Sequence, residues 1–396
     1  MKLLFLLLFI LQINLTGKQF LYVCSNDGLL TFSINSENGQ LKLIDTFIDP
    51  HKRGYKMTKV SPNKNFLYAH VFRHKKHPAA IQTFKIQKNG KLKKITEIAS
   101  STGNHVYIDI DTNGDFMYAL GENSEKEQVV IAYKINNGIC DSSSFTEARV
   151  GETGQHAVAM SPKGQHLYVP HIRINKIYQF NFNRNTNKIT PLSPPYINGP
   201  NENEFPTAHD PRHLIFHPKL NIMYTSLEFG GGISSWKINS NGSLQLWQTF
   251  QNRPINYKYP FDSKNPEVIL NKSSDIHMTS NAKFIYVPNR DNRTRRKVNN
   301  PQLPLSSGND TITTYSVNKD GSLSHPLQNI DTGRHVRCLT SFKNFLYATG
   351  VYSGTIHTYR IDQNSGKLTE INLKNGLPLI QNIDFPMWMS QLSLEP

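Results

Sequence analysis

The sequence predicts an all-β fold, a seven-bladed β-propeller closed by a C-terminal strand that joins the N-terminal blade. Two short patterns support this prediction, because each occurs seven times along the 396 residues and the two run in phase. In addition, the chain begins inside a repeat and ends with the piece that the first repeat lacks. No segment shows a sustained 3.6-residue hydrophobic period, so almost no helix is expected.

The first pattern is a pair of mostly aromatic or aliphatic residues followed by a tyrosine, as in Phe66-Leu67-Tyr68. The seven tyrosines are Tyr22, Tyr68, Tyr118, Tyr168, Tyr224, Tyr286 and Tyr347. Successive tyrosines are 46 to 62 residues apart. This spacing fits repeats that each form one four-stranded blade.

The second pattern is a turn rich in Gly and Asn between runs of β-branched and aromatic residues, which is typical of hairpins. The seven turns are Asn38-Gly39, Asn89-Gly90, Asn137-Gly138, Asn185 to Asn187, Asn241-Gly242, Asp320-Gly321 and Ser365-Gly366. A third element, such as Val60-Ser61-Pro62, closes a short apolar strand before most of the tyrosine strands. Each unit therefore consists of strand A, a turn, strand B with the tyrosine, strand C, the hairpin and strand D.

The two ends of the chain complement each other. The first repeat begins at strand B, near Phe20, and the segment Pro386-Met387-Trp388-Met389 has the form of a strand A with nothing after it. Pairing of these segments would close the ring and remove the open edges that a sheet must otherwise protect.

The chain has 44 Lys and Arg against 29 Asp and Glu, a formal charge of +15, which favours anionic partners. No basic helix, zinc-ligand spacing or RNA-binding signature focuses this charge, so a small anionic substrate is expected rather than nucleic acid. The three cysteines include no C-x-x-C pair, which leaves at most a single disulfide. There is no G-x-S-x-G, H-E-x-x-H or phosphate-binding glycine loop, so neither a metal nor a cofactor is predicted.

The N-terminus has the features of a secretory signal peptide over residues 1–17: a lysine, a short apolar run and small residues before Lys18. Residues 18–396 are expected to form one propeller domain without a membrane span, and we expect a monomer. The location would be periplasmic or secreted if the signal peptide functions, and cytoplasmic otherwise.

The phase of the repeat assigns each loop to a face of the disc. The longest insertions, Ser193 to Asp210, Asn252 to Ser274 and Asp291 to Asn309, all fall in connections at the face where strand A starts and strand B ends. Loops on a rigid scaffold commonly carry function. A basic run within the last insertion, Arg293 to Lys297, is either part of an anion-binding surface or a solvated loop.

Ionisable residues concentrate at the same face. Those at starts of strand A are His156, Arg212, His213, Asp275, His335 and Arg337, and those at ends of strand B are Glu228 and Arg290. Because strand A is innermost in a propeller, these groups should meet at the mouth of the central channel. Arginines there can grip carboxylate or phosphate groups, and a histidine or glutamate can act as a general base.

The chain resembles the propeller-type lactonase family, which includes cycloisomerase-type 6-phosphogluconolactonases and carboxy-muconate cyclases. The resemblance covers nearly the whole chain after residue 19 and rests on Asp210 to Pro218, Glu228, Ser274 to Thr279, Tyr286 to Arg290 and Pro386 to Trp388. It implies that His156, Arg212, Glu228 and Arg290 are catalytic, with the arginines holding anionic groups and the other two as candidate acid and base. It leaves open which of Arg334, His335 and Arg337 supplies a further arginine-type position.

The resemblance implies metal-independent hydrolysis of a sugar lactone, with His213, Asp275, His335 and Arg337 as substrate-binding residues. Two other functions are compatible with the same residues. One is the reversible lactonisation of a muconate-like acid, and the other is a secreted propeller that binds an anionic ligand without turning it over.

Overall fold

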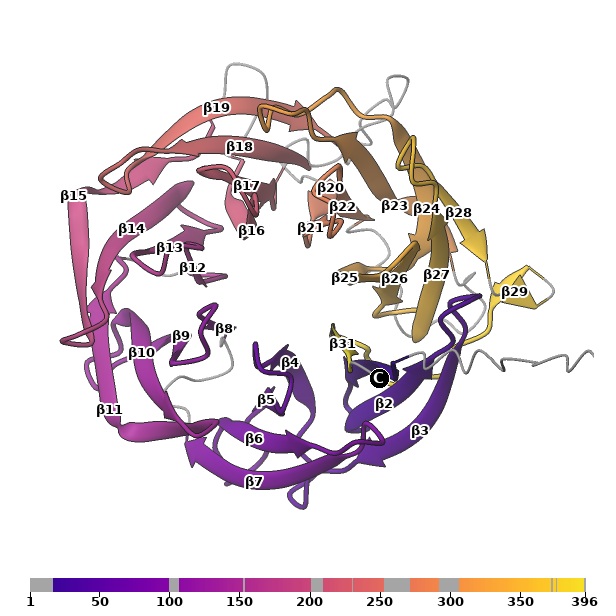
Figure 1. Cartoon of the computed structure of the whole chain (residues 1–396), viewed down its shortest axis with the longest axis horizontal. Helices are drawn as coiled ribbons and strands as arrows, with labels where there is room; N and C mark the ends of the chain where they lie inside the picture. Colours follow the sequence, from indigo (N-terminus) through magenta and orange to yellow (C-terminus); the bar gives the residue numbers. More distant parts are fainter. Residues whose placement is uncertain are drawn as a thin grey trace, which may run out of the picture.

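The computed structural model describes residues 17–99, 107–151, 154–200, 209–229, 231–252, 271–291, 306–371, 373–374 and 376–394. In this part of the chain the strands form seven radial sheets around a central axis, which confirms the predicted β-propeller (Figure 1). We number the blades by their second strand in chain order. Within the described ranges, no helix has the length and apolar character needed to cross a bilayer.

The inner two strands of each blade carry the residues that matter for the channel. The innermost strands are β31 (Trp388–Ser393), β4 (Tyr55–Val60), β8 (Ile108–Ile110), β12 (Ala159–Met160), β16 (Pro211–Phe216), β21 (His277–Met278) and β25 (Val336–Phe342). The second strands, which contain the repeated tyrosines, are β1 (Gln19–Cys24), β5 (Phe66–Val71), β9 (Phe116–Glu122), β13 (His166–His171), β17 (Ile222–Leu227), β22 (Phe284–Asp291) and β26 (Phe345–Gly350). All pairings within the blades are antiparallel, for example between β4 and β5.

The outer two strands complete each blade. The third strands are β2 (Leu29–Ile34), β6 (Ala80–Ile86), β10 (Gln128–Asn136), β14 (Lys176–Asn183), β18 (Gly232–Ile238), β23 (Ser306–Ser316) and β27 (Thr355–Ile361). The outermost are β3 (Leu41–Phe47), β7 (Leu92–Ala99), β11 (Ile139–Arg149), β15 (Lys188–Asn198), β19 (Leu244–Gln251), β24 (Gln328–Gly333) and β28 (Leu368–Ile371). Beyond these, β20 (Asn271–Ser273) adds to blade 6, while β29 (Leu373–Lys374) and β30 (Leu377–Pro378) form a small hairpin.

The C-terminus closes the ring as the sequence predicts. Strand β31 pairs with β1 along its whole length and becomes the innermost strand of blade 1. The predicted strand, Pro386 to Met389, was placed too early, because the ladder begins at Trp388 and continues to Ser393. Met387 still donates its backbone N–H to the carbonyl of Cys24, at 2.9 Å, just ahead of the ladder.

The first predicted insertion also begins later than the sequence suggested. Residues 193–198 belong to strand β15, which stays paired with β14 across a register shift between Tyr178 and Phe180. Prolines 194 and 195 in this stretch made it look like a loop. An outermost strand tolerates proline because one side of its backbone has no ladder partner. Most of the remaining insertion residues, including Arg293 to Lys297, lie outside the described residues, as do residues 1–16 of the predicted signal peptide.

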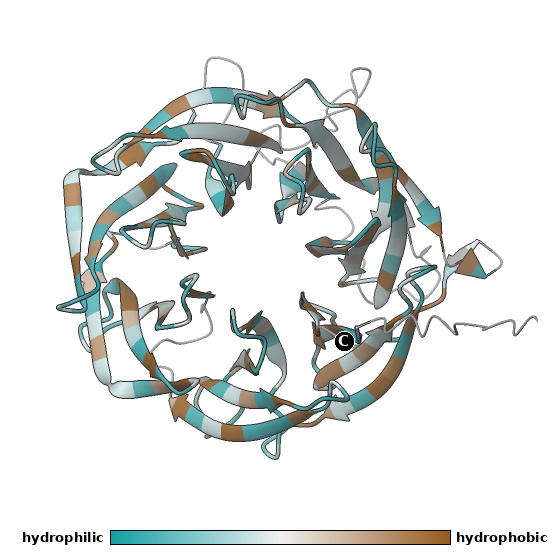
Figure 2. Ribbon diagram, viewed as in Figure 1, coloured by the Kyte–Doolittle hydropathy of each residue, from teal (hydrophilic) through white to brown (hydrophobic). Residues whose placement is uncertain are grey.

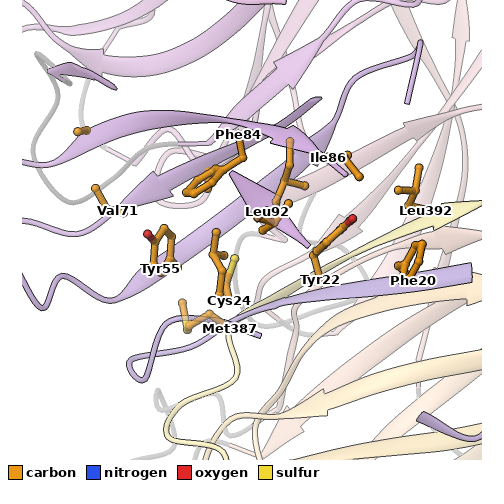
Figure 3. Close-up of a cluster of buried hydrophobic side chains, with 14 of the residues drawn as sticks. Phe20, Tyr22, Cys24, Tyr55, Val71, Phe84, Ile86, Leu92, Met387 and Leu392 are labelled. Carbon is orange, nitrogen blue, oxygen red and sulfur yellow. The ribbon is translucent and has the colours of Figure 1, made fainter. Parts of the chain in front are cut away.

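The hydrophobic core lies between neighbouring blades. Hydrophobic and hydrophilic residues alternate along the strands, so each sheet has two apolar faces to bury (Figure 2). Between blades 1 and 2, Tyr22 and Cys24 pack with Tyr55 and Phe84, and Met387 from the C-terminal segment joins them (Figure 3). The three cysteines are buried and free, so the one disulfide that the sequence allowed does not form.

One contact recurs from blade to blade and links the two sequence patterns. The tyrosine hydroxyl of a second strand donates a hydrogen bond to the glycine carbonyl in the hairpin of the next blade. The pairs are Tyr22–Gly90, Tyr68–Gly138, Tyr168–Gly242, Tyr224–Gly321, Tyr286–Gly366 and Tyr347–Gly39, with distances of 2.6 to 3.0 Å. The last pair joins blade 7 to blade 1, so it spans the closure of the ring.

The glycine is required by both backbone shape and space. Gly242 has φ +86°, and a Cβ there would lie 2.3 Å from the ring of His166, which starts the same strand as Tyr168. Blade 4 is the exception among the described hairpins, because its turn ends in Asn187 instead of glycine. Correspondingly, the buried hydroxyl of Tyr118 has no hydrogen-bond partner in the described structure.

This exception provides a matched pair of variants. Tyr168→Phe should lower the free energy of unfolding by about 1–3 kcal/mol, because it leaves the carbonyl of buried Gly242 without a donor. Tyr118→Phe should change it by less than about 0.5 kcal/mol or stabilise the protein, since it removes a hydroxyl that pays for burial without a bond. Urea denaturation of both variants measures the difference, and equal losses would contradict a stabilising role for the contact.

Candidate active site

A cavity of 480 Å³ opens at the mouth of the central channel. Its basic lining residues are Lys56, Arg173, Arg212, Lys272, Arg290 and Arg337. Glu122 and Glu228 are the acidic residues among the described lining, and His156 and His335 also face the cavity. The cavity therefore has an excess of positive charge, as expected of a site for an anionic ligand.

The repeat places several of these residues at one equivalent position. Lys56, His156 and Arg212 each lie 12 residues before the tyrosine of their blade, and Arg337 lies 10 residues before Tyr347 because its turn is shorter. The same position is Ser274 in blade 6 and Val106 in blade 3, which is outside the described residues. Four blades thus present a basic side chain at a single level of the channel.

An irregularity in the innermost strand accompanies this position in five blades of the described structure. There the inner strand has one more residue than its partner between two paired positions, as in a β-bulge. The irregularities fall between Tyr55 and Met57, Gln155 and Ala159, Pro211 and Leu214, Ser273 and His277, and Val336 and Leu339. Bulges redirect side chains, and here they accompany the mouth residues.

Glu228 connects two arginines at the mouth. Its Oε2 lies 2.5 Å from Nε of Arg212, and its Oε1 lies 2.8 Å from Nη2 of Arg290. All three side chains are almost fully buried. Glu228 follows strand β17, whose pairing with β16 places it beside Arg212, and Arg290 comes from β22 of the next blade. Arg290 also donates to the carbonyl of Ser273, at 2.9 Å.

The second partner of Arg212 is a histidine held by an aspartate. Asp275 Oδ1 accepts a hydrogen bond from Nδ1 of His213, at 2.9 Å, and His213 Nε2 lies 3.1 Å from Nη1 of Arg212. The other carboxylate oxygen of Asp275 accepts the backbone N–H of Leu339, at 2.8 Å. Arg212 also donates to the carbonyl of Ser274. Arg212 is therefore fixed by groups from two neighbouring blades.

The charges at the mouth shift its titrating groups in different directions. Burial raises the pKa of Glu228, but the guanidinium groups of Arg290 and Arg212 outweigh it and bring that pKa down to about 2. Burial, reinforced by Arg212, lowers the pKa of His156 well below 6.5. Burial, with Arg337 and Arg212, lowers the pKa of Lys56 to about 7. At neutral pH the site therefore holds an ionised glutamate, a neutral histidine and a lysine close to its titration point.

The structure brings most of the predicted site residues together. His156, Arg212, Glu228, Arg290, His335 and Arg337 line the 480 Å³ cavity. His213 lines a smaller cavity beside it, whereas Asp275 lines neither and reaches the site through His213. Of the three candidates left open by the sequence, His335 and Arg337 face the cavity, while Arg334 donates to the carbonyl of Tyr352.

Lys56 was missed by the sequence reasoning. It lines both cavities and stands at the position that His156 and Arg212 occupy in their blades. The signal was present, because Lys56 lies 12 residues before Tyr68. Counting back from each tyrosine would have identified it.

The fold and this site define a family of propellers. The chain belongs to the family described as lactonase, 7-bladed beta-propeller, whose model matches residues 20–380. The chain is 27% identical over 378 residues to the 6-phosphogluconolactonase of Blochmanniella floridana, covering 95% of this chain and 98% of that protein. It is also 27% identical over 365 residues to the 6-phosphogluconolactonase of Buchnera aphidicola subsp. Schizaphis graminum, covering 89% and 92%.

A solved structure gives the same fold at lower identity. The periplasmic gluconolactonase of Pseudomonas aeruginosa superposes with a TM-score of 0.75 at 15% identity, over 96% of this chain and 100% of that one. At this identity the likeness concerns the fold alone.

The paired arginines make the charge of Glu228 important for stability. Glu228→Gln should destabilise the protein by about 3–5 kcal/mol at neutral pH, because two buried guanidinium groups lose their counter-ion. Glu122→Gln is the control, since Glu122 also lines the cavity but accepts a hydrogen bond from the neutral amide of Gln128, at 2.9 Å. Urea denaturation compares the two, and equal effects would contradict the charge argument.

The same pair has a defined pH dependence. The folded pKa of Glu228 is lowered to about 2, so its contribution is complete above the ordinary carboxyl pKa of 4.5 and is lost as the pH falls toward 2. The stability gap between the wild type and Glu228→Gln should therefore narrow below about pH 4. A gap that stays constant to lower pH would show that the lost charge is not its cause.

Proposed function

We propose that the protein hydrolyses a phosphorylated sugar lactone at the channel mouth, with 6-phosphogluconolactone as the first substrate to test. The observation that supports this most strongly is the Arg212–Glu228–Arg290 arrangement beside a neutral histidine in a positively charged cavity. The names of the relatives point to the same reaction class. A periplasmic or secreted location remains part of the proposal, to be tested by the N-terminus of the mature protein.

Each residue has a defined part in the reaction. The guanidinium of Arg290 stabilises negative charge on the lactone carbonyl oxygen as water adds to the carbonyl carbon. His156 takes the proton from that water, since its lowered pKa keeps it neutral and able to accept one. The tetrahedral intermediate then breaks the bond to the ring oxygen, and the imidazolium returns the proton to that oxygen. The products are a carboxylic acid and a hydroxyl group.

Glu228 is better suited to holding the arginines than to accepting a proton. A carboxylate with a pKa of about 2 is a weak base, and both of its oxygens already contact guanidinium groups. Through these contacts Glu228 sets the distance between Arg212 and Arg290. Arg212 is nearly enclosed by its partners, so Arg290 is the guanidinium that we assign to the carbonyl oxygen.

Acid release from the lactone, corrected for spontaneous hydrolysis, tests this proposal. His156→Ala should lower kcat by about 10²–10⁴-fold, the usual contribution of a general base. His325→Ala serves as the control, because His325 is exposed and lies in the hairpin region between β23 and β24, on the opposite face. Full activity in His156→Ala would contradict the assignment.

The same assay separates the alternatives. A muconate substrate would be followed through the ultraviolet absorbance of its diene, and turnover of muconate without turnover of any lactone would favour a cyclase. Thermal stabilisation by anionic ligands without any product would favour a binding propeller. Either result would overturn lactone hydrolysis as the function.

A further inference from the structure

A second, smaller cavity of 60 Å³ lies beside the first and is lined in part by the same residues, Lys56, Gln155, His156 and Arg337. It reaches one residue further along the inner strands, to Met57 and Trp388. Since one water needs about 10–15 Å³ of such space, the cavity has room for roughly four waters or one tetrahedral anion.

The charged groups around this inner cavity are all of one sign. Lys56 and Arg337 line it together with the neutral rings of Tyr107 and Trp388, and none of the described lining residues is an aspartate or glutamate. Lys56 comes from blade 2 and Arg337 from blade 7, on either side of the closing strand in blade 1. Both lie at the strand irregularities that accompany the mouth residues.

Two neighbouring cations in a confined site are unfavourable unless an anion compensates them. The effect is visible on Lys56, whose pKa falls to about 7 through burial and the charges of Arg337 and Arg212. Arg212 and Arg290 differ, because Glu228 already balances their charge. The inner cavity is therefore where an added anion would remove the most repulsion.

We propose that Lys56 and Arg337 form an anion subsite that binds the phosphate group of the substrate, and that Lys56 takes up a proton as the phosphate binds. The choice of a phosphorylated sugar acid as ligand rests on the proposed function, whereas the subsite itself does not. His156 lines both cavities, so it would lie between the phosphate and the lactone carbonyl.

The other groups that face Lys56 do not titrate in the same range. Those nearest are Arg337 on β25, Arg212 and His213 on β16, His156 before β12, Tyr107 before β8 and His70 on β5. Across the larger cavity are Glu122, Arg173, Glu228, Lys272, Arg290 and His335. Burial lowers the pKa of His70, His156 and His213 below 6.5 and raises that of Tyr107 well above 10. Proton uptake just above neutral pH is therefore assigned to Lys56.

The sign of the linkage follows from this shift. An anion favours the protonated amine, so the pKa of Lys56 should rise when phosphate binds. At about pH 7.5–8 the free protein has largely lost this proton and the complex has it, so binding takes up protons. Affinity should fall as the pH rises further.

Titration calorimetry with 6-phosphogluconate at about pH 8, in two buffers of different ionisation enthalpy, measures both affinity and proton uptake. Lys56→Met should weaken binding at least about tenfold and abolish the uptake. Lys56→Arg should bind without uptake, because arginine stays protonated. Lys59→Met is the control, since Lys59 lies on the same strand but pairs with Asp109, at 2.6 Å.

Inorganic phosphate and gluconate, used as separate ligands, identify the group that binds. Phosphate should show the Lys56-dependent uptake and gluconate should not. The subsite is overturned if wild type binds 6-phosphogluconate without proton uptake, if Lys56→Met retains full affinity and uptake, or if gluconate shows the uptake instead. Because calorimetry with the product requires no turnover, the failure of lactone hydrolysis would leave this result intact.

Discussion

The contact between a tyrosine hydroxyl and the hairpin glycine of the next blade governs how the blades are seated against one another. It joins the innermost region of one sheet boundary to the turn of the next, and the pair Tyr347–Gly39 carries it across the closure of the ring. Because each blade is held in the same way, equivalent residues of different blades come to the same level of the channel. A catalytic mouth assembled from many blades depends on that uniform seating.

The mouth uses this regularity and departs from it at defined points. One position per blade supplies Lys56, His156, Arg212 and Arg337, and the strand irregularities accompany each of them. The charges then divide into two groups. The guanidinium groups of Arg212 and Arg290 share a carboxylate, which suits them to a fixed position, whereas Lys56 and Arg337 face a cavity lined by no described acidic residue.

The repeat made the fold predictable, because tyrosine and glycine are required by a contact that recurs in almost every blade. It also placed His156, Arg212 and Glu228 at the mouth. Other features depend on pairing that a local pattern does not contain. Lys56 has no motif around it, strand β15 continues through prolines, and the link from Asp275 through His213 to Arg212 joins two blades. The low pKa of Glu228 likewise required knowing that two arginines converge on it.

A crystal structure of the protein with bound 6-phosphogluconate would test the central claim, that one ligand spans both charge groups at the channel mouth. The account predicts the phosphate between Lys56 and Arg337, and the carboxylate beside Arg290 and His156. A ligand bound on the opposite face, or one bound at the mouth without contact to either group, would contradict it.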